Sequence, residues 1–101
     1  MNVVTLEAAE EELRKARDYY EFQRQGLGQE FILAFEEAMG RILDFPEAWG
    51  VIAKNVRCCI FKRFEYGILY VLRDEKIFVL AVMHLKRRPG YWRKRLREIE
   101  G

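Results

Sequence analysis

The sequence predicts an α+β domain in which a helical hairpin packs on a twisted, mainly antiparallel sheet. Two observations predict this class. Apolar residues recur at helical spacing in the first half of the chain, whereas β-branched and aromatic runs fill the second half. The order of elements is β-α-α-β-β-β with a short C-terminal helix. A chain of 101 residues suits one hydrophobic core, so we expect a single domain over residues 1–101.

A short strand and a helix are predicted at the start of the chain. The segment "NVVTL" is apolar and β-branched, which is typical of a strand. Ala9, Leu13, Ala16 and Tyr20 follow at the spacing of one stripe of an amphipathic helix. This helix should end near Arg24, because the "GLG" run at 26–28 then breaks the pattern.

A second helix is predicted after this break. Phe31, Phe35 and Ile42 repeat at helical spacing, and the helix must stop before Pro46. Because only a few residues link the two helices, we expect them to form an antiparallel hairpin.

Three strands should follow the hairpin, and a tight turn at Asp74 and Glu75 should join the last two. The third strand is apolar at nearly every position, which predicts a central strand covered on both faces. Pro89 and Gly90 end it, and "YWRKRLREIE" predicts a closing helix. The three strands are "VRCCIFKRF" (56–64), "YGILYVLR" (66–73) and "KIFVLAVMHL" (76–85).

Composition excludes several classes of protein. The longest apolar run falls far short of the roughly 18 to 20 residues that span a membrane. The N-terminal residues lack the basic start and apolar stretch of a secretion signal, so we expect a cytoplasmic location. Cys58 and Cys59 are adjacent and would point to opposite faces of a strand, which predicts two reduced thiols. We expect no metal and no cofactor.

Charge is distributed unevenly along the chain. Residues 1–53 hold five basic and eleven acidic side chains, whereas residues 54–101 hold thirteen basic and five acidic ones. Seven of the basic residues lie between 84 and 97, a stretch without an acid. The second half of the chain should therefore bind an acidic protein segment or a nucleic acid.

Several stretches resemble the RelE/ParE superfamily of type II toxins, which includes the plasmid-stabilisation proteins. They are the tyrosine pair at 19–20 before Gly-Leu-Gly, Phe31, Pro46 before a Trp, Arg57 at a strand start, "RFEYGILY" and a His followed by "RRPGYW". The resemblance covers residues 2 to about 97 and implies the hairpin-on-sheet fold predicted above. It also implies a cognate antitoxin, whose disordered acidic C-terminal segment neutralises the toxin in a hetero-oligomer.

The ending "HLKRRPGYWRKR" is more similar to the ParE branch, whose members poison DNA gyrase. The resemblance therefore implies a toxin that binds and traps a target such as gyrase rather than catalysing a reaction. Antitoxin-binding candidates are Tyr19, Tyr20, Leu27, Arg57 and Arg63. Target-binding candidates are Arg87, Arg88, Tyr91, Trp92, Arg93, Lys94 and Arg95.

The alternative is a RelE-like endonuclease that enters the ribosome and cleaves mRNA. Metal-free RNA cleavage needs a base, cations for the phosphate and an acid for the leaving oxygen. Arg57, Arg63, His84 and Tyr91 are the candidates for this chemistry. For His84 the alternative is a structural role, which is more common for a lone His at the end of a core strand. For Arg57 the alternative is an ion pair with an acid of the hairpin. A third possibility is a toxin fold that retains antitoxin binding without killing.

Overall fold

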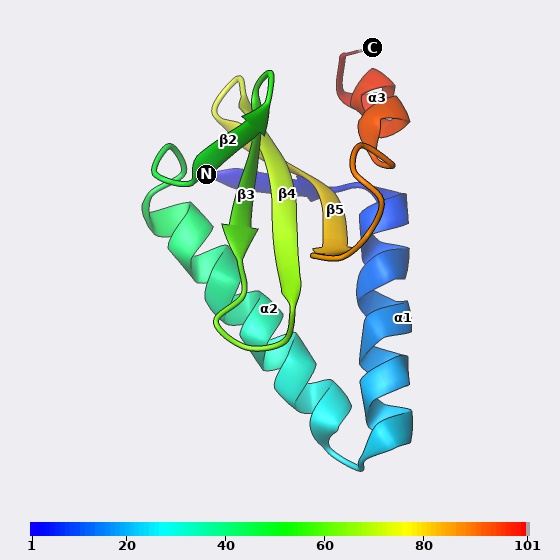
Figure 1. The fold of residues 1–101 in the computed structure, drawn as a ribbon. Helices are drawn as coiled ribbons and strands as arrows, with labels where there is room; N and C mark the ends of the chain where they lie inside the picture. Colours follow the sequence, from blue (N-terminus) through cyan, green and yellow to red (C-terminus); the bar gives the residue numbers. More distant parts are fainter. Residues whose placement is uncertain (101) are drawn as a thin grey trace.

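Five strands form one sheet, and a helical hairpin covers one of its faces (Figure 1). This arrangement comes from a computed structural model that describes residues 1–100. The predicted α+β class is confirmed. The elements are β1 (Asn2–Thr5), α1 (Glu7–Gln23), α2 (Leu27–Asp44), β2 (Gly50–Ala53), β3 (Val56–Ile60), β4 (Tyr66–Arg73), β5 (Lys76–His84), the 3₁₀ turn η1 (Arg93–Arg95) and α3 (Leu96–Glu100).

The strands lie in the order β1-β5-β4-β3-β2. β1 runs parallel to β5, and every other neighbouring pair is antiparallel. β5 is therefore an interior strand, as its nearly continuous apolar sequence predicts. Asp74 and Glu75 both have positive φ values, 53° and 59°, which is the geometry of a type I′ hairpin turn between β4 and β5.

Two features of the sheet differ from the sequence prediction. The short edge strand β2 was not predicted; it pairs with β3 through an irregular register at Val51 and Ala53. The predicted strand 56–64 ends early, at Ile60. Phe64 adopts a left-handed conformation with φ of 67°, which turns the chain back toward β4.

The helical hairpin is fixed at its tip by Glu21. Its carboxylate accepts hydrogen bonds from the backbone N–H groups of Gly26 and Gly28, each at about 3.0 Å. These bonds satisfy N–H groups at the start of α2, which lacks a side-chain cap at Gly26. A Cβ atom on Gly28 would lie 2.8 Å from the carbonyl oxygen of Arg17, so the two helices approach closely here.

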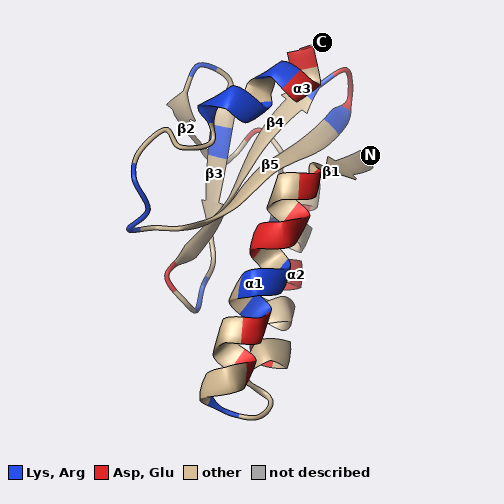
Figure 2. Ribbon diagram, turned by 90° about the vertical axis from the view of Figure 1, so that its right-hand side faces the viewer, with Lys and Arg blue, Asp and Glu red and all other residues tan. Residues whose placement is uncertain are grey.

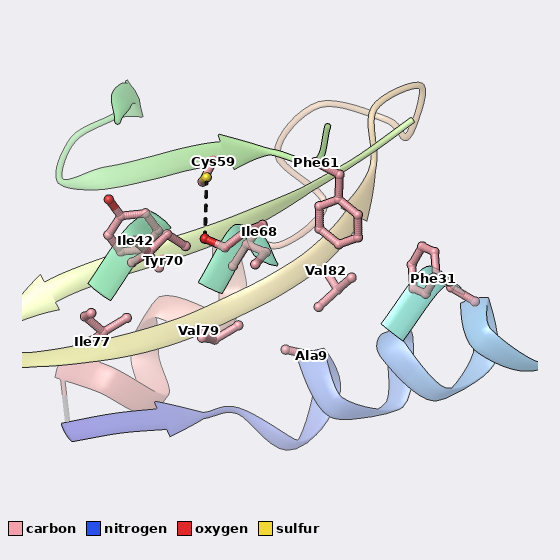
Figure 3. Close-up of a cluster of buried hydrophobic side chains, with 12 residues drawn as sticks. Ala9, Phe31, Ile42, Cys59, Phe61, Ile68, Tyr70, Ile77, Val79 and Val82 are labelled. Atoms are coloured by element: carbon pink, nitrogen blue, oxygen red, sulfur yellow. Dashed lines mark hydrogen bonds between the residues drawn. The ribbon is translucent and has the colours of Figure 1, made fainter. Parts of the chain in front are cut away.

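The main core lies between the hairpin and the sheet (Figure 3). Phe31 and Ile42 from α2 pack against strand residues such as Tyr70, and all three are fully buried. The Tyr70 hydroxyl donates a 2.6 Å hydrogen bond to the carbonyl of Pro46. Cys59 also lies in this core, as the dashed contact to the carbonyl oxygen of Ala38 shows. No helix within residues 1–100 is long and apolar enough to cross a bilayer.

A second apolar cluster lies on the opposite face of the sheet. Leu69, Val71 and Leu80 contribute to it from β4 and β5, and the C-terminal segment covers it with Trp92 and Leu96. The prediction that β5 is covered on both faces is therefore confirmed.

β5 contains a β-bulge that brings two consecutive side chains to this second face. The register with β4 shifts by one residue after Leu69, so Leu80 has no partner in β4. Leu80 and Ala81 consequently both belong to the second cluster. Val79 and Val82, on either side of them, both belong to the core under the hairpin.

Candidate functional site

Residues 85–95, which we call the basic segment, connect β5 to the C-terminal turns. Figure 2 shows Lys and Arg gathered on this loop and on η1, whereas α1 begins with acidic bands. The side chains of Arg87, Arg88, Arg93 and Lys94 are exposed. From residue 85 to residue 92 the segment contains neither helix nor strand, so its conformation depends on contacts with the rest of the fold.

Glu12 on α1 provides the strongest of these contacts. Arg95 binds it through two nitrogens, with Nη1 2.8 Å from Oε1 and Nη2 3.0 Å from Oε2. The Tyr91 hydroxyl donates to Oε2 at 2.7 Å. Only 16% of the Glu12 side chain and 18% of the Arg95 side chain are exposed. A bidentate pair shielded from water in this way is stronger than a typical surface ion pair.

The same pair binds the backbone of β5 beyond the point where β1 covers it. β1 ends opposite Val79. Past that residue, the Val82 N–H donates to Glu12 Oε1 at 3.0 Å. The Leu80 carbonyl, in the bulge, accepts from Arg95 Nη1 at 3.1 Å. Glu12 and Arg95 thus satisfy polar groups that a neighbouring strand would otherwise bind.

Two aromatic side chains of the basic segment hold its cations in place. The guanidinium carbon of Arg87 lies 4.0 Å from the centre of the Tyr91 ring, and that of Arg93 lies 5.2 Å from the Trp92 ring. Burial and the bond to Glu12 raise the pKa of Tyr91, so its phenol stays protonated and keeps its donor role.

These contacts narrow the list of predicted target-binding residues. Trp92 is 3% exposed and belongs to the second apolar cluster, so its ring is covered by the fold. Arg95 is engaged by Glu12 and by the bulge. Tyr91 is half-buried. Of the predicted residues, Arg87, Arg88, Arg93 and Lys94 are the exposed ones.

An apolar hollow adjoins these cations. A cavity of about 250 Å³ lies between the basic segment and β2, and its wall includes Ile52, Met83, Leu85 and Arg93. Ile52 and Leu85 are exposed apolar residues. An apolar centre with a charged rim is the usual composition of a protein-binding surface.

Three of the four predicted ribonuclease residues, Arg57, Arg63 and His84, are not brought together; Tyr91, the fourth, binds Glu12, which lines the cavity beside His84. Arg57 lies opposite Tyr70 and His84 lies opposite Tyr66, which places them about 13 Å apart along β4. Arg63 pairs with a carboxylate of α2 at the tip of the hairpin.

Arg57 binds backbone carbonyls, which differs from the alternative of pairing with an acid of the hairpin. Its Nη1 donates to the carbonyl oxygens of Glu47 and Trp49, at 2.9 and 2.7 Å. It therefore fixes the loop between α2 and β2 through backbone groups.

His84 lies beside a cavity of about 200 Å³ whose wall includes Lys15, Tyr19 and Arg87. Its Nδ1 accepts a hydrogen bond from the Lys86 N–H at 3.1 Å, which leaves Nε2 to carry the proton of the neutral ring. Its ring also packs edge-on against a tyrosine of β4. His84 thus has one backbone hydrogen bond and one ring contact, and it borders this cavity.

The predicted antitoxin-binding residues of the hairpin differ in exposure. Tyr19 is 59% exposed, whereas Tyr20 packs against Phe31 and Phe64 in an aromatic cluster. Leu27 is partly buried. Phe22, which the sequence analysis did not select, is 84% exposed on the same helix as Tyr19.

Glu12 was also missed by the sequence analysis. It lies in a run of acids at the start of α1, and nothing in that run distinguishes the one glutamate that turns inward. Within the described part of the chain, no three acidic, His or Cys side chains are grouped closely enough to hold a metal ion.

A helical hairpin on a mainly antiparallel sheet is the fold of the small RelE/ParE-like toxins. A family model described as the ParE toxin of the type II toxin-antitoxin system parDE matches residues 3–89. The chain therefore belongs to the family of ParE toxins of type II toxin-antitoxin systems.

Solved structures agree on the fold. A chain of the chromosomal ParDE toxin-antitoxin system from P. aeruginosa superposes with a TM-score of 0.63 at 12% identity, over 85% of this chain and 97% of that one. The isolated E. coli RelE toxin gives a TM-score of 0.59 at 18% identity, over 97% of both chains. A comparison with curated proteins found no match.

Proposed function

We propose that this ParE toxin inhibits growth by binding and trapping a target such as DNA gyrase in the cytoplasm. The observation that carries the proposal is an apolar hollow whose wall includes Arg87 and Arg93, with further exposed cations beside them in the chain. Arg87, Arg88, Arg93 and Lys94 supply the charge, and the cavity beside Ile52 supplies apolar contact area. Charge of one sign accelerates the encounter with an acidic partner, and the apolar centre slows dissociation.

The positions of the ribonuclease candidates support binding over catalysis. A nuclease needs its base, acid and phosphate-binding cations within reach of one phosphodiester. Arg57, Arg63 and His84 are instead each engaged at separate places in the fold. The RelE-like alternative is favoured only by the cavity beside His84 and by the likeness of fold to the E. coli RelE toxin.

We further propose that a cognate antitoxin with a disordered, acidic C-terminal segment neutralises this toxin in a hetero-oligomer. The exposed rings of Tyr19 and Phe22 on α1 offer apolar anchors, and the basic segment offers charge, whereas Arg63 would have to exchange its carboxylate partner on α2 for one of the antitoxin. Affinity for such a segment should fall as salt rises, because the attraction is between screened charges.

The test is to induce the toxin in bacteria without an antitoxin and to follow DNA, RNA and protein synthesis separately. We expect DNA synthesis to stop first, with DNA damage signalling. An immediate stop in translation with cleaved mRNA would instead support the RelE-like alternative. Normal growth would indicate an inactive relative.

A matched pair of charge reversals sharpens this test. Arg93→Glu combined with Lys94→Glu should abolish toxicity. Lys54→Glu combined with Lys76→Glu changes the net charge equally at exposed sites outside the segment and should leave toxicity intact. His84→Gln should also leave it largely intact, and loss of both toxicity and mRNA cleavage in that variant would contradict trapping.

A further inference from the structure

The basic segment is a stretch of like charges that has no reason to stay folded by itself. Six Lys and Arg residues lie between 85 and 95, and like charges at this density repel one another. The segment has no regular structure before η1. Something outside the segment must therefore offset the repulsion and fix its path.

We propose that Glu12 is the positioning residue of the basic segment, holding Tyr91 and Arg95 so that the free cations are presented together to the target. This inference rests on the proposed function of that segment. Both carboxylate oxygens are used: Oε1 accepts from Arg95 and from the Val82 N–H, and Oε2 accepts from Tyr91 and from Arg95. One side chain of α1 thus joins the segment to the part of β5 that β1 leaves uncovered.

The position of the free cations follows from this anchor. Tyr91 is held through its hydroxyl, and Arg87 lies over the face of its ring at 4.0 Å. Arg95 is held through its guanidinium, and the adjacent residues Arg93 and Lys94 belong to the same 3₁₀ turn. Glu12 therefore positions Arg87 before the buried Trp92 and Arg93 and Lys94 after it, in each case through Tyr91 or Arg95.

Release of the anchor should lower affinity for the target without unfolding the sheet. Glu12→Gln keeps the size of the side chain but removes the charge that pairs with Arg95. The cations would then have to be ordered at the moment of binding, and ordering a few long side chains lowers affinity by about tenfold or more. The main core under the hairpin does not contain Glu12.

The experiment compares Glu12→Gln with Glu10→Gln, an exposed glutamate of the same helix. All variants carry Trp49→Phe, so that Trp92 is the remaining tryptophan of the two in the chain. The measurements are growth inhibition on induction without antitoxin, acrylamide quenching of Trp92, and far-UV circular dichroism. Tyr91→Phe is a milder variant that removes only the hydroxyl bond, and it keeps the test valid if Glu12→Gln fails to fold.

We expect Glu12→Gln to retain its circular dichroism spectrum, to expose Trp92 to acrylamide, and to lose toxicity by about tenfold or more. Tyr91→Phe should show a smaller loss, and Glu10→Gln should show none. A residue that acts only through global stability would not change Trp92 quenching in molecules that remain folded.

Two results would overturn the inference: unchanged toxicity in a Glu12→Gln variant with an exposed Trp92, or a Trp92 that stays protected in that variant. The charge reversal of Arg93 and Lys94 separates this failure from a failure of the proposed function. If the reversal abolishes toxicity and Glu12→Gln does not, the positioning role alone is wrong. If neither affects toxicity, the basic segment is not the effector surface.

Discussion

Alanine at two glycines of α2 should change the stability of the fold in opposite directions. Gly28 is the second residue of the helix, and a Cβ atom there would lie 2.8 Å from the Arg17 carbonyl oxygen and 2.9 Å from the Glu21 carboxylate. The first of these atoms belongs to backbone and cannot turn away. Gly40 lies in the helix interior, and a Cβ atom there would meet nothing within 4 Å.

At each glycine, the sign of the change in stability depends on the gain in helix propensity compared with the cost of steric contact. Alanine in a helix interior is favoured over glycine by about 0.5–1 kcal/mol, and by less near the first turn. Forcing a methyl group into a packed contact costs about 1–3 kcal/mol. Gly28→Ala should therefore destabilise the fold by about 1–2 kcal/mol net. Gly40→Ala should stabilise it by about 0.5–1 kcal/mol.

Urea unfolding followed by circular dichroism measures both changes. With a slope of about 1–1.5 kcal/mol per molar urea for a chain of this size, the Gly28→Ala midpoint should fall by roughly 1 M. The Gly40→Ala midpoint should rise by roughly 0.5 M. If Gly28→Ala stabilises the fold as much as Gly40→Ala does, the close approach of the two helices carries no energetic cost and the reasoning is refuted.

Two further predictions concern titration of buried groups. Burial raises the pKa of Tyr70 to about 12, and burial together with its bond to Glu12 raises the pKa of Tyr91. Phenols of the unfolded chain ionise near roughly pH 10, so above that pH the unfolded state binds fewer protons than the folded state. The free energy of unfolding should therefore be unaffected below about pH 10 and should fall above it. A urea midpoint that stays constant from about pH 9 to about pH 11 would contradict this. Burial likewise raises the pKa of Cys58 to about 11. At roughly pH 8, iodoacetamide should therefore alkylate this thiol about a hundredfold more slowly in the folded protein than in urea. Equal alkylation rates would show that the thiol is not shielded.

The helical hairpin could be predicted closely because its signals are local. The stripe from Ala9 to Tyr20 defines the exposed and buried sides of α1, and Pro46 limits α2. The tight turn at Asp74 is also a local signal. Each of these features depends on residues within one turn or one helix.

The elements that the sequence did not reveal depend on distant partners. β2 has only four residues, two of them exposed and apolar, and it is a strand because β3 lies beside it. Arg57 binds loop carbonyls, which no pattern of side chains specifies. The bond between Glu12 and Arg95 joins residues 83 positions apart, a distance at which helical or strand periodicity carries no information.

At the bulge in β5, the basic segment is held through backbone groups of the strand and not through its side chains. The groups that receive Glu12 and Arg95 are an N–H and a carbonyl, which every residue except proline offers. Apolar exchanges such as Leu80→Ile should therefore be tolerated, whereas Val82→Pro would remove the donor. Loss of one residue from this strand would restore regular alternation and remove the irregularity on which the attachment depends. The attachment of the basic segment therefore depends on the length of β5 more than on its side-chain chemistry.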